Sequence, residues 1–301
     1  MGSSPATGRG RLNPALRVAL YLPALAVAAG GFEMLSGLVW RLVSGMLALP
    51  LLLSLPGGER GDTLLRRGAF VAAVLLVTYI FRRDLDRRSF TSLGLRPGPG
   101  WVRESLIGFA LGAALMALVL GTELGLGAYR VRAFAWQQRS FDSILAALGL
   151  SLVGFVVVAF YEELVARGYI LQNLAAAWGT RAGLIVSPAI FALAHLFNPG
   201  AGQLSSVGLF FAGLLLAGGY LASGRLWLPM GLHLSWNLFQ GPLFGFPVSG
   251  LRTTSLISLE SAGPDLLTGA SFGPEASVIG VLASLVGLAF LWCWAGIKRE
   301  G

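Results

Sequence analysis

Long apolar stretches separated by short polar segments make up most of the chain. An α-helix of about 20 apolar residues spans the hydrocarbon core of a bilayer, so each long stretch predicts a membrane helix. The predicted spans are Val18–Val39, Gly68–Phe81, Val102–Leu124, Ile144–Leu171, Gly183–Phe197, Val207–Ala222, Leu226–Phe239 and Ala276–Ile297. The pattern therefore predicts an all-α, polytopic bundle of about eight transmembrane helices.

The N-terminal end of this pattern allows more than one interpretation. Leu42–Leu55 is apolar but short for a span, so it is either a re-entrant or interfacial piece or a continuation of the first helix past Arg41. The basic start of the chain and the Ala26-Val27-Ala28 run resemble a signal peptide with its cleavage site. We favour a first membrane span, because a polytopic chain needs no cleaved signal.

The rest of the chain predicts one domain with a short tail. Residues 1–16 are small and polar and include Gly and Pro, which predicts a disordered N-terminal tail. Residues 17–301 contain no repeat of 20–50 residues and form one predicted membrane domain. Within it, Gly108 and Gly112 have the small-xxx-small spacing that brings two membrane helices into close contact.

The charges are distributed unevenly between the apolar stretches. Six arginines lie between Arg82 and Arg103, and the positive-inside rule assigns such a segment to the cytoplasm. Gly241–Glu275 carries one base, Arg252, against three acidic residues, which predicts an extracytoplasmic segment. Lys298 follows the last span on the cytoplasmic side. We therefore expect both termini in the cytoplasm.

Composition agrees with a membrane protein and excludes other classes. Hydrophobic residues make up 55% of the chain and charged residues 12%, whereas soluble domains carry about 25% charged residues. The net charge of +8 forms no single basic face, so we expect no nucleic-acid partner. The single cysteine, Cys293, excludes an internal disulfide. We expect a multi-pass integral protein of a bacterial cytoplasmic membrane, in contact with membrane lipid.

One predicted span, Ile144–Leu171, contains three charged residues. A charged side chain at the centre of a membrane helix costs roughly 2.5–3.5 kcal/mol, so Glu162, Glu163 and Arg167 need a structural or chemical reason. Glu163 and Arg167 stand four residues apart with the acid first, the favourable order for an ion pair along a helix. Glu162 points about 100° away and has no partner in its own span, so we expect it to face another helix.

The two histidines of the chain, His195 and His233, also lie in apolar spans, and Asn237 follows His233 by four residues. Ionisable groups inside a membrane usually face one another or a cavity, so we expect three helices to bring Glu162 and both histidines around one pocket. There the carboxylate can act as a general base, while an imidazole can donate to a developing oxyanion or hold a metal. Asn237 can orient the imidazole or donate to a carbonyl.

Each of these residues also has a purely structural interpretation. The Glu163–Arg167 pair can fix the register of helices without touching a substrate, and we favour this interpretation for the pair. A single histidine or asparagine inside a membrane is commonly a hydrogen-bond partner between helices. For His195 and His233 this interpretation weakens, because both histidines and an unpaired glutamate occur in spans marked by polar residues.

Known sequence signatures narrow the chemistry. The chain has no His-Glu-x-x-His zinc motif, no Gly-x-Ser-Gly serine motif, no Gly-x-Gly-Asp aspartyl motif and no Walker A loop. It does contain Glu-Glu-x-x-x-Arg at Glu162–Arg167, Phe-x-x-x-His at Phe191–His195 and His-x-x-x-Asn at His233–Asn237. In this order, the three motifs resemble those of the CPBP family, which contains type II CAAX prenyl endopeptidases and bacteriocin-processing or immunity proteins. The resemblance covers about residues 143–243.

The resemblance implies an intramembrane endopeptidase that cleaves membrane-associated peptides or proteins, with residues 143–243 as its catalytic core. The implied catalytic residues are Glu162, His195, His233 and Asn237, and the supporting residues are Glu163 and Arg167. Glu162 would activate the attacking water, and the others would stabilise the oxyanion or bind a metal. If a metal is present, the expected ion is zinc and its expected ligands are Glu162, His195 and His233.

Two other function classes stay open from the sequence. A non-enzymatic membrane binding or immunity protein could use the same motifs, and its function would survive Glu162→Gln, whereas an endopeptidase would lose its activity. A small-solute transporter could use the polar cluster as an ion site. Transporters favour inverted repeats with matching broken helices, and the chain shows none.

Overall fold

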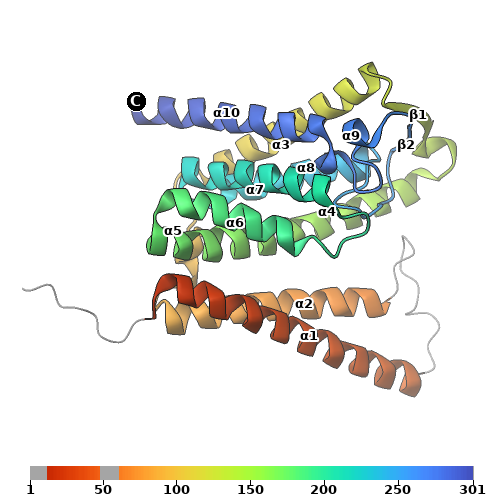
Figure 1. Cartoon of the computed structure of the whole chain (residues 1–301). Helices are drawn as coiled ribbons and strands as arrows, with labels where there is room; N and C mark the ends of the chain where they lie inside the picture. Colours follow the sequence, from red (N-terminus) through yellow and green to blue (C-terminus); the bar gives the residue numbers. More distant parts are fainter. Residues whose placement is uncertain (1–11, 48–60, 301) are drawn as a thin grey trace, which may run out of the picture.

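The structure of the protein is a computed structural model that describes residues 12–47 and 61–300. Its principal helices lie side by side and form a bundle (Figure 1). They are α1 (Pro14–Leu47), α2 (Gly61–Ile80), α3 (Trp101–Gly125), α4 (Phe141–Glu163), α5 (Gln172–Trp178), α6 (Thr180–Ala194), α7 (Gln203–Ser223), α8 (Trp227–Leu238) and α10 (Val278–Glu300). The prediction of an all-α, polytopic bundle is confirmed.

Five helical segments in the described part of the chain are long and apolar enough to cross a membrane. They are Pro14–Leu42, Trp101–Gly125, Phe141–Trp178, Gln203–Ser223 and Val278–Gly296. The helix α6 is apolar but shorter, and α2 and α8 are not among the five segments found in the described residues. The five segments support an integral membrane protein, while the number of about eight spans stays a prediction.

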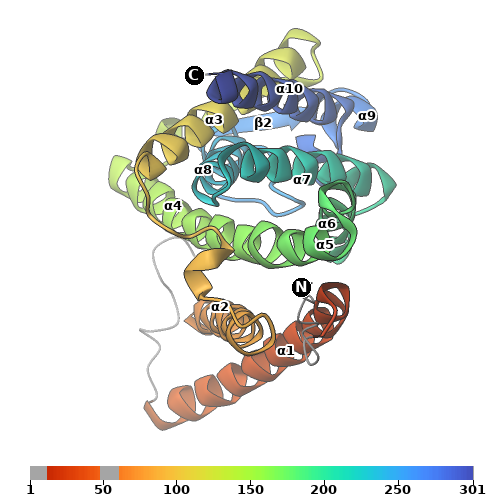
Figure 2. The same ribbon diagram turned by 90° about the vertical axis from the view of Figure 1, so that its left-hand side faces the viewer.

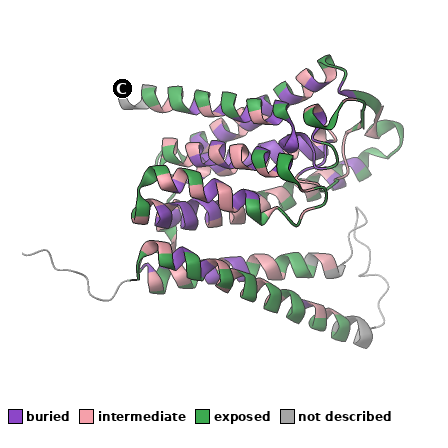
Figure 3. Cartoon of the chain, viewed as in Figure 1, coloured by how far each residue is buried: buried purple, intermediate pink, exposed green. Residues whose placement is uncertain are grey.

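The outer faces of the helices are exposed (Figure 3), and many of the side chains there are large and apolar. Met34 on α1 is 80% exposed, and Trp292 on α10 is 82% exposed. In water, an apolar surface of this extent would promote association. In a bilayer the same side chains lie against lipid tails, which agrees with a membrane-embedded bundle.

The helix α8 lies inside the bundle and packs against α3, α4 and α7 (Figure 2). Its approach to α3 is so close that a side chain on Gly108 or Gly112 would overlap the backbone of Leu228 or Leu232. Gly231 on α8 meets the backbone of α3 in the same way. The small-xxx-small spacing therefore makes the predicted close contact, and α8 carries its polar side chains into the interior of the bundle.

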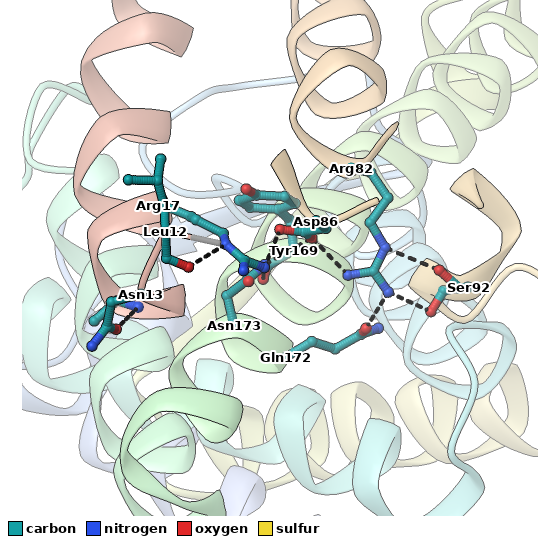
Figure 4. A network of polar contacts seen from close by, with 10 residues as sticks. Leu12, Asn13, Arg17, Arg82, Asp86, Ser92, Tyr169, Gln172 and Asn173 are labelled. Atoms are coloured by element: carbon teal, nitrogen blue, oxygen red, sulfur yellow. Dashed lines mark hydrogen bonds and ion pairs between the residues drawn. The ribbon is translucent and has the colours of Figure 1, made fainter. Parts of the chain in front are cut away.

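The N-terminal helices form a hairpin beside this core. The helix α1 packs along α2 and also contacts α5 (Figure 2). A set of mostly buried polar side chains, which we call the Asp86 network, joins the hairpin to the core (Figure 4). Its members are Arg17, Arg82, Asp86, Ser92, Gln172 and Asn173.

Asp86 is the centre of this network. Its carboxylate accepts hydrogen bonds from Arg17 Nη1 at 3.0 Å, from Arg82 Nη1 at 2.9 Å and from Asn173 Nδ2 at 3.3 Å. The other donors of Arg82 bond to a serine and a glutamine of the same network. The network thus connects α1, the segment that follows α2, and α5.

The first helix differs from its predicted boundaries. It begins at Pro14, so the end of the predicted tail, residues 1–16, is already helical, while residues 1–11 lie outside the described residues. It continues past Arg41 to Leu47. For the beginning of Leu42–Leu55 the structure therefore supports a continuation of the first helix, and residues 48–60 lie outside the described residues.

Two segments outside the predicted spans contain regular structure. β1 (Tyr129–Phe134) and β2 (Ile257–Ser261) pair as a small antiparallel sheet in an otherwise helical protein. The segment Gly241–Glu275 also contains the short helix α9 (Asp265–Thr268), and it leads into the 3-10 turn η7 (Pro274–Ala276). Several residues of this segment are buried. It is therefore a packed part of the fold, about which the sequence predicted only an extracytoplasmic location.

The two segments with opposite charge balance lie at opposite ends of the bundle (Figure 1). The connection between α2 and α3, which contains Arg82–Arg103, lies at one end, and β2 and α9 lie at the other. The start of α1 and the end of α10 lie at the same end as the Arg-rich connection. This arrangement agrees with the predicted sidedness, and the assignment of that end to the cytoplasm stays a prediction.

Candidate active site

The acidic motif lies where an α-helix changes into a π-helix. The helix α4 ends at Glu163, and the chain continues as the π-helical segment η5 (Leu164–Leu171) before α5. π-helical turns within α-helices are frequent at functional sites. The change of helix type follows Glu162 and Glu163 directly, and Arg167 lies within η5.

Glu163 on α4 and Arg167 on η5 form a pair that contacts three further helices. The Glu163 side chain is fully buried, and Oε1 accepts hydrogen bonds from Arg167 Nη1 at 2.8 Å and from His233 Nδ1 at 2.9 Å. Arg167 also donates from Nη2 to the carbonyl of Gly213 on α7, and its guanidinium lies 4.6 Å from the centre of the Phe191 ring on α6. The predicted ion pair is confirmed, and its contacts extend to α6, α7 and α8.

The imidazole of His233 is oriented from another helix. Asn237 lies four residues further along α8 and is also buried, but no hydrogen bond joins the two side chains in the described part of the chain. Nδ1 of His233 donates instead to Glu163, and a carboxylate is a stronger acceptor than a neutral amide. Of the two roles that the spacing allowed for Asn237, orienting the imidazole is therefore not observed.

His195 stands at the C-terminal end of α6, where its own helix fixes the ring. Nδ1 lies 2.8 Å from the carbonyl oxygen of Phe191, four residues earlier. A carbonyl only accepts, so Nδ1 carries the hydrogen and Nε2 of the neutral imidazole is an acceptor. The Phe191 ring packs 4.7 Å from the His195 ring and 6.2 Å from the His233 ring, measured between centres. The Phe-x-x-x-His motif therefore supports both imidazoles.

Three polar atoms meet at the centre of the site. Glu162 Oε2 lies 4.0 Å from His195 Nε2 and 3.8 Å from His233 Nε2. Each imidazole already uses Nδ1, for Phe191 or Glu163, so both Nε2 atoms are left to face Glu162. These separations are too long for direct hydrogen bonds and suit one small polar group, such as a water, between the side chains. The structure thus brings together the residues that the sequence predicted around one pocket.

The side chains of Glu162, His195 and His233 are of the types that bind zinc, but they are not placed to bind one ion together. Two imidazole nitrogens and a carboxylate are common zinc ligands, with bonds of about 2.0–2.2 Å. Within residues 12–47 and 61–300, however, no group of three or more His, Cys, Asp or Glu side chains is placed to hold a metal ion. Glu162, His195 and His233 would have to move closer together to do so, and their present spacing suits a water better.

Further groups contact the site without a clear signal in the sequence. The Tyr161 hydroxyl donates to Glu162 Oε1 at 3.3 Å, and the Phe70 ring of α2 packs edge-on against the Tyr161 ring. The carbonyl of Gly213 accepts from Arg167. Tyr161 could have been suspected from its place beside Glu162, although packing was the simpler interpretation. A backbone carbonyl such as that of Gly213 has no sequence signature.

Apolar helices around a carboxylate that faces two imidazoles define the class, which is an integral membrane protein with ionisable side chains gathered inside its helix bundle. Residues 144–239 match the family model described as "Rce1-like: Type II CAAX prenyl endopeptidase Rce1-like". No curated protein and no solved structure matches the chain.

The matched segment covers about a third of the chain and contains all three sequence motifs. The resemblance to the CAAX protease family is therefore confirmed over this segment. The match supports a protease-type enzyme that acts on a peptide or protein.

Proposed function

We propose that this protein is an intramembrane endopeptidase that hydrolyses peptide bonds of membrane-associated substrates with a water activated by Glu162. The observation that carries the proposal is the convergence of Glu162 Oε2 with the Nε2 atoms of His195 and His233, inside a segment that matches an endopeptidase family. The proposed catalytic core, residues 143–243, belongs to a single membrane domain, residues 17–301.

The reaction begins with a water between Glu162 and His195. Both side chains present acceptor atoms, so the water donates one hydrogen to each and keeps a lone pair free for the peptide carbonyl carbon. As the new C–O bond forms, Glu162 takes a proton from the water. The tetrahedral intermediate then collapses, the C–N bond breaks, and Glu162 returns the proton to the leaving amine. The products are a carboxylic acid and an amine, and Glu162 is again ionised.

The oxyanion of the intermediate needs hydrogen-bond donors. In the proposed mechanism His233 is protonated and donates from Nε2, because Nδ1 is occupied by Glu163. The carboxylate of Glu163 stabilises the imidazolium and fixes its ring. Asn237 donates to the same oxygen from its side-chain amide. Arg167 supports this arrangement by pairing with Glu163.

The proposal is tested with the full chain in lipid nanodiscs and a quenched fluorescent peptide that ends in a farnesylated Cys-aliphatic-aliphatic-X sequence. The same peptide without the prenyl group is the second probe. Glu162→Gln should lower cleavage by about 10²–10⁴-fold, because it removes the general base and keeps the side-chain shape. Asp142→Asn, in the exposed first turn of α4, is the matched control and should cleave normally. Unchanged cleavage by Glu162→Gln would contradict the proposal.

The same variant separates an endopeptidase from the other function classes. A binding or immunity protein would keep its function in Glu162→Gln. For an endopeptidase, a membrane peptide that accumulates uncut in cells carrying Glu162→Gln, and not in cells with the wild type, identifies the natural substrate. A covalent acyl-enzyme trapped during turnover would exclude direct attack by water.

A metal-dependent version of the same hydrolysis is the alternative mechanism. A zinc ion held by Glu162, His195 and His233 would polarise the scissile carbonyl. Metal analysis should then find about one zinc per chain, lost in His195→Ala and in His233→Ala, and a chelator should stop cleavage. Cleavage by metal-free protein in the presence of the chelator supports the water mechanism, which we favour because no His-x-x-x-His pair preorganises a zinc site.

We also propose that the Arg-rich end of the bundle, with both termini, faces the cytoplasm. The positive-inside rule supports this orientation. It is tested with a single exposed cysteine at each end, Ser89→Cys or Ala262→Cys, in a Cys293→Ser background. A membrane-impermeant thiol reagent should label Ala262→Cys on intact cells and Ser89→Cys only after lysis. Labelling of both from the same side would contradict the orientation.

A further inference from the structure

A buried carboxylate outside the matched segment lies close to the turn that carries His195. Glu275 belongs to η7 and is 6% exposed. Its Oε2 accepts two hydrogen bonds from Ser249, from the backbone N–H at 2.6 Å and from the hydroxyl at 3.0 Å. Neither residue lies in a sequence motif or in residues 144–239. Their contacts therefore concern a part of the fold that the family match does not describe.

Ser249 has a backbone conformation that needs support. Its φ is +46°, in the left-handed region that residues other than glycine seldom adopt. The two hydrogen bonds to Glu275 hold Ser249 on one side, and its carbonyl accepts a hydrogen bond from Asn198 Nδ2 at 3.0 Å on the other. The direction of the Ser249 carbonyl thus depends on Glu275.

Asn198 lies in the turn that ends α6. Its backbone N–H donates to the carbonyl of His195 at 3.0 Å, and its own carbonyl accepts from Ala201 at 3.1 Å. The same turn packs tightly against the segment Gly241–Glu275. The approach is so close that a side chain on Gly250 would overlap the carbonyl oxygen of Pro199. A continuous series of contacts therefore runs from Glu275 through Ser249 and Asn198 to His195.

Glu275 is also close enough to His195 for the two side chains to interact electrostatically. Burial raises the pKa of Glu275, whereas hydrogen bonding by Ser249 and Gln240, and a positive charge on His195 when its imidazole is protonated, lower it. Glu275 and His195 therefore lie within electrostatic reach of each other, in addition to the hydrogen-bonded path between them.

We propose that Glu275 is a positioning residue for His195, acting through Ser249 and Asn198. The inference rests on the proposed function of His195 in holding the attacking water. Nε2 of His195 faces Glu162 only while the turn after α6 keeps its conformation. The hydrogen bond from Asn198 to the Ser249 carbonyl holds that turn. A misplacement of about 1 Å at a reacting group can cost about 100-fold in rate.

The inference is tested on the full chain in nanodiscs with the two peptide probes named above. Glu275→Met keeps the length of the side chain and removes both acceptor atoms, so kcat should fall about 10- to 100-fold while KM stays within about twofold. Glu275→Gln keeps one acceptor for Ser249 and should restore most of the rate. Glu260→Gln, an exposed carboxylate on β2, is the control and should behave as the wild type.

A second variant interrupts the same path at another point. Asn198→Asp keeps the shape of the side chain but cannot donate to the Ser249 carbonyl, so it should lower kcat in the same way. If both residues act through one path, Glu275→Met combined with Asn198→Asp should lose no more activity than the worse single variant. Losses that multiply would overturn the shared path. If Glu275→Met does not fold, the kcat of Asn198→Asp alone tests the inference, and an unchanged kcat would overturn it.

Hydrogen exchange gives a readout that does not depend on activity. In Glu275→Met the amides of Asn198 and Ala201 should exchange faster than in the wild type, while those of α3 and α8 stay unchanged. Wild-type protein that cleaves neither probe argues against the proposed function, and the exchange result still tests the link to the His195 turn. Unchanged exchange of that turn in both Glu275→Met and Asn198→Asp would overturn the inference.

Discussion

Two groups of charged residues inside this bundle differ in how far their polar atoms are paired by hydrogen bonds. In the Asp86 network, both carboxylate oxygens of Asp86 accept from arginines, and Nε, Nη1 and Nη2 of Arg82 all donate (Figure 4). In the candidate site, Glu162 Oε2 faces two imidazole nitrogens at 3.8 and 4.0 Å and forms no direct hydrogen bond to either. The charged side chains of the first group are paired with one another, while Glu162 Oε2 and the two imidazole Nε2 atoms face a shared space.

The two groups also differ in their exposure and in what they connect. The side chains of Arg82 and Asp86 are each 2% exposed, whereas that of Glu162 is 18% exposed. The Asp86 network joins the α1–α2 hairpin to the core, while Glu162 faces His195 at the end of α6 and His233 on α8. A buried group whose charges are paired fixes the packing of helices, and a carboxylate with partial access leaves room for a reactant. Burial of charge alone therefore does not mark a site; partial access and the two facing imidazoles distinguish Glu162 from Asp86.

Glu163 pairs with buried Arg167 and also binds His233 of the candidate site, so its replacement should have the largest effect. Glu163→Gln leaves Arg167 buried without its anion and should cost about 3–5 kcal/mol in the free energy of unfolding. It also removes the carboxylate that holds His233, so cleavage by the folded fraction should fall at least about 100-fold. Chemical denaturation in detergent and the peptide assay measure the two effects.

A double variant separates the two roles of Glu163. Glu163→Gln combined with Arg167→Met removes both charges, and replacement of a whole buried pair is often nearly neutral for stability. Stability should therefore recover, while activity should stay low because His233 still lacks its carboxylate. Recovery of activity along with stability would show that Glu163 has only a structural role.

Asp86→Asn should have an effect on stability alone. The substitution keeps the shape of the side chain but removes the anion shared by Arg17 and Arg82, which should cost about 3–5 kcal/mol. The fraction that remains folded should cleave the probe at the wild-type rate. Asp84→Asn, an exposed neighbour in the same turn, is the matched control and should change neither quantity. A loss of kcat in folded Asp86→Asn would remove the distinction between the two groups.

Tyr161→Phe should have the smallest effect. The hydroxyl donates to Glu162 Oε1 at 3.3 Å, a long hydrogen bond, and the ring contact with Phe70 survives the change. A typical hydrogen bond contributes about 0.5–1.5 kcal/mol, so kcat should fall by about tenfold or less and stability should hardly change. A loss as large as that of Glu162→Gln would mean that Tyr161 itself touches the reacting atoms.

Contacts that depend on spacing along one helix could be predicted from the sequence, without the tertiary structure. Glu163 and Arg167 pair because residues four apart on a helix lie on the same face, and the acid precedes the base. The same geometry turned Glu162 away from the pair, toward other helices. Five apolar segments long enough to cross a membrane and the close approach at Gly108 and Gly112 could be predicted in the same way. Span length depends on the run of apolar residues, and a close helix contact on the spacing of small residues.

Contacts between distant segments required the rotation and depth of each helix. Helical spacing offered Asn237 as the partner of His233, and packing supplied Glu163 from α4 instead. Asp86 meets Arg17 across 69 positions in the chain, and Ser249 meets Glu275 inside a segment that the sequence predicted only to be extracytoplasmic. Hydropathy shows only that a polar group needs a partner. The identity of the partner depends on which helix faces bury each other, and the packing of the whole bundle sets that.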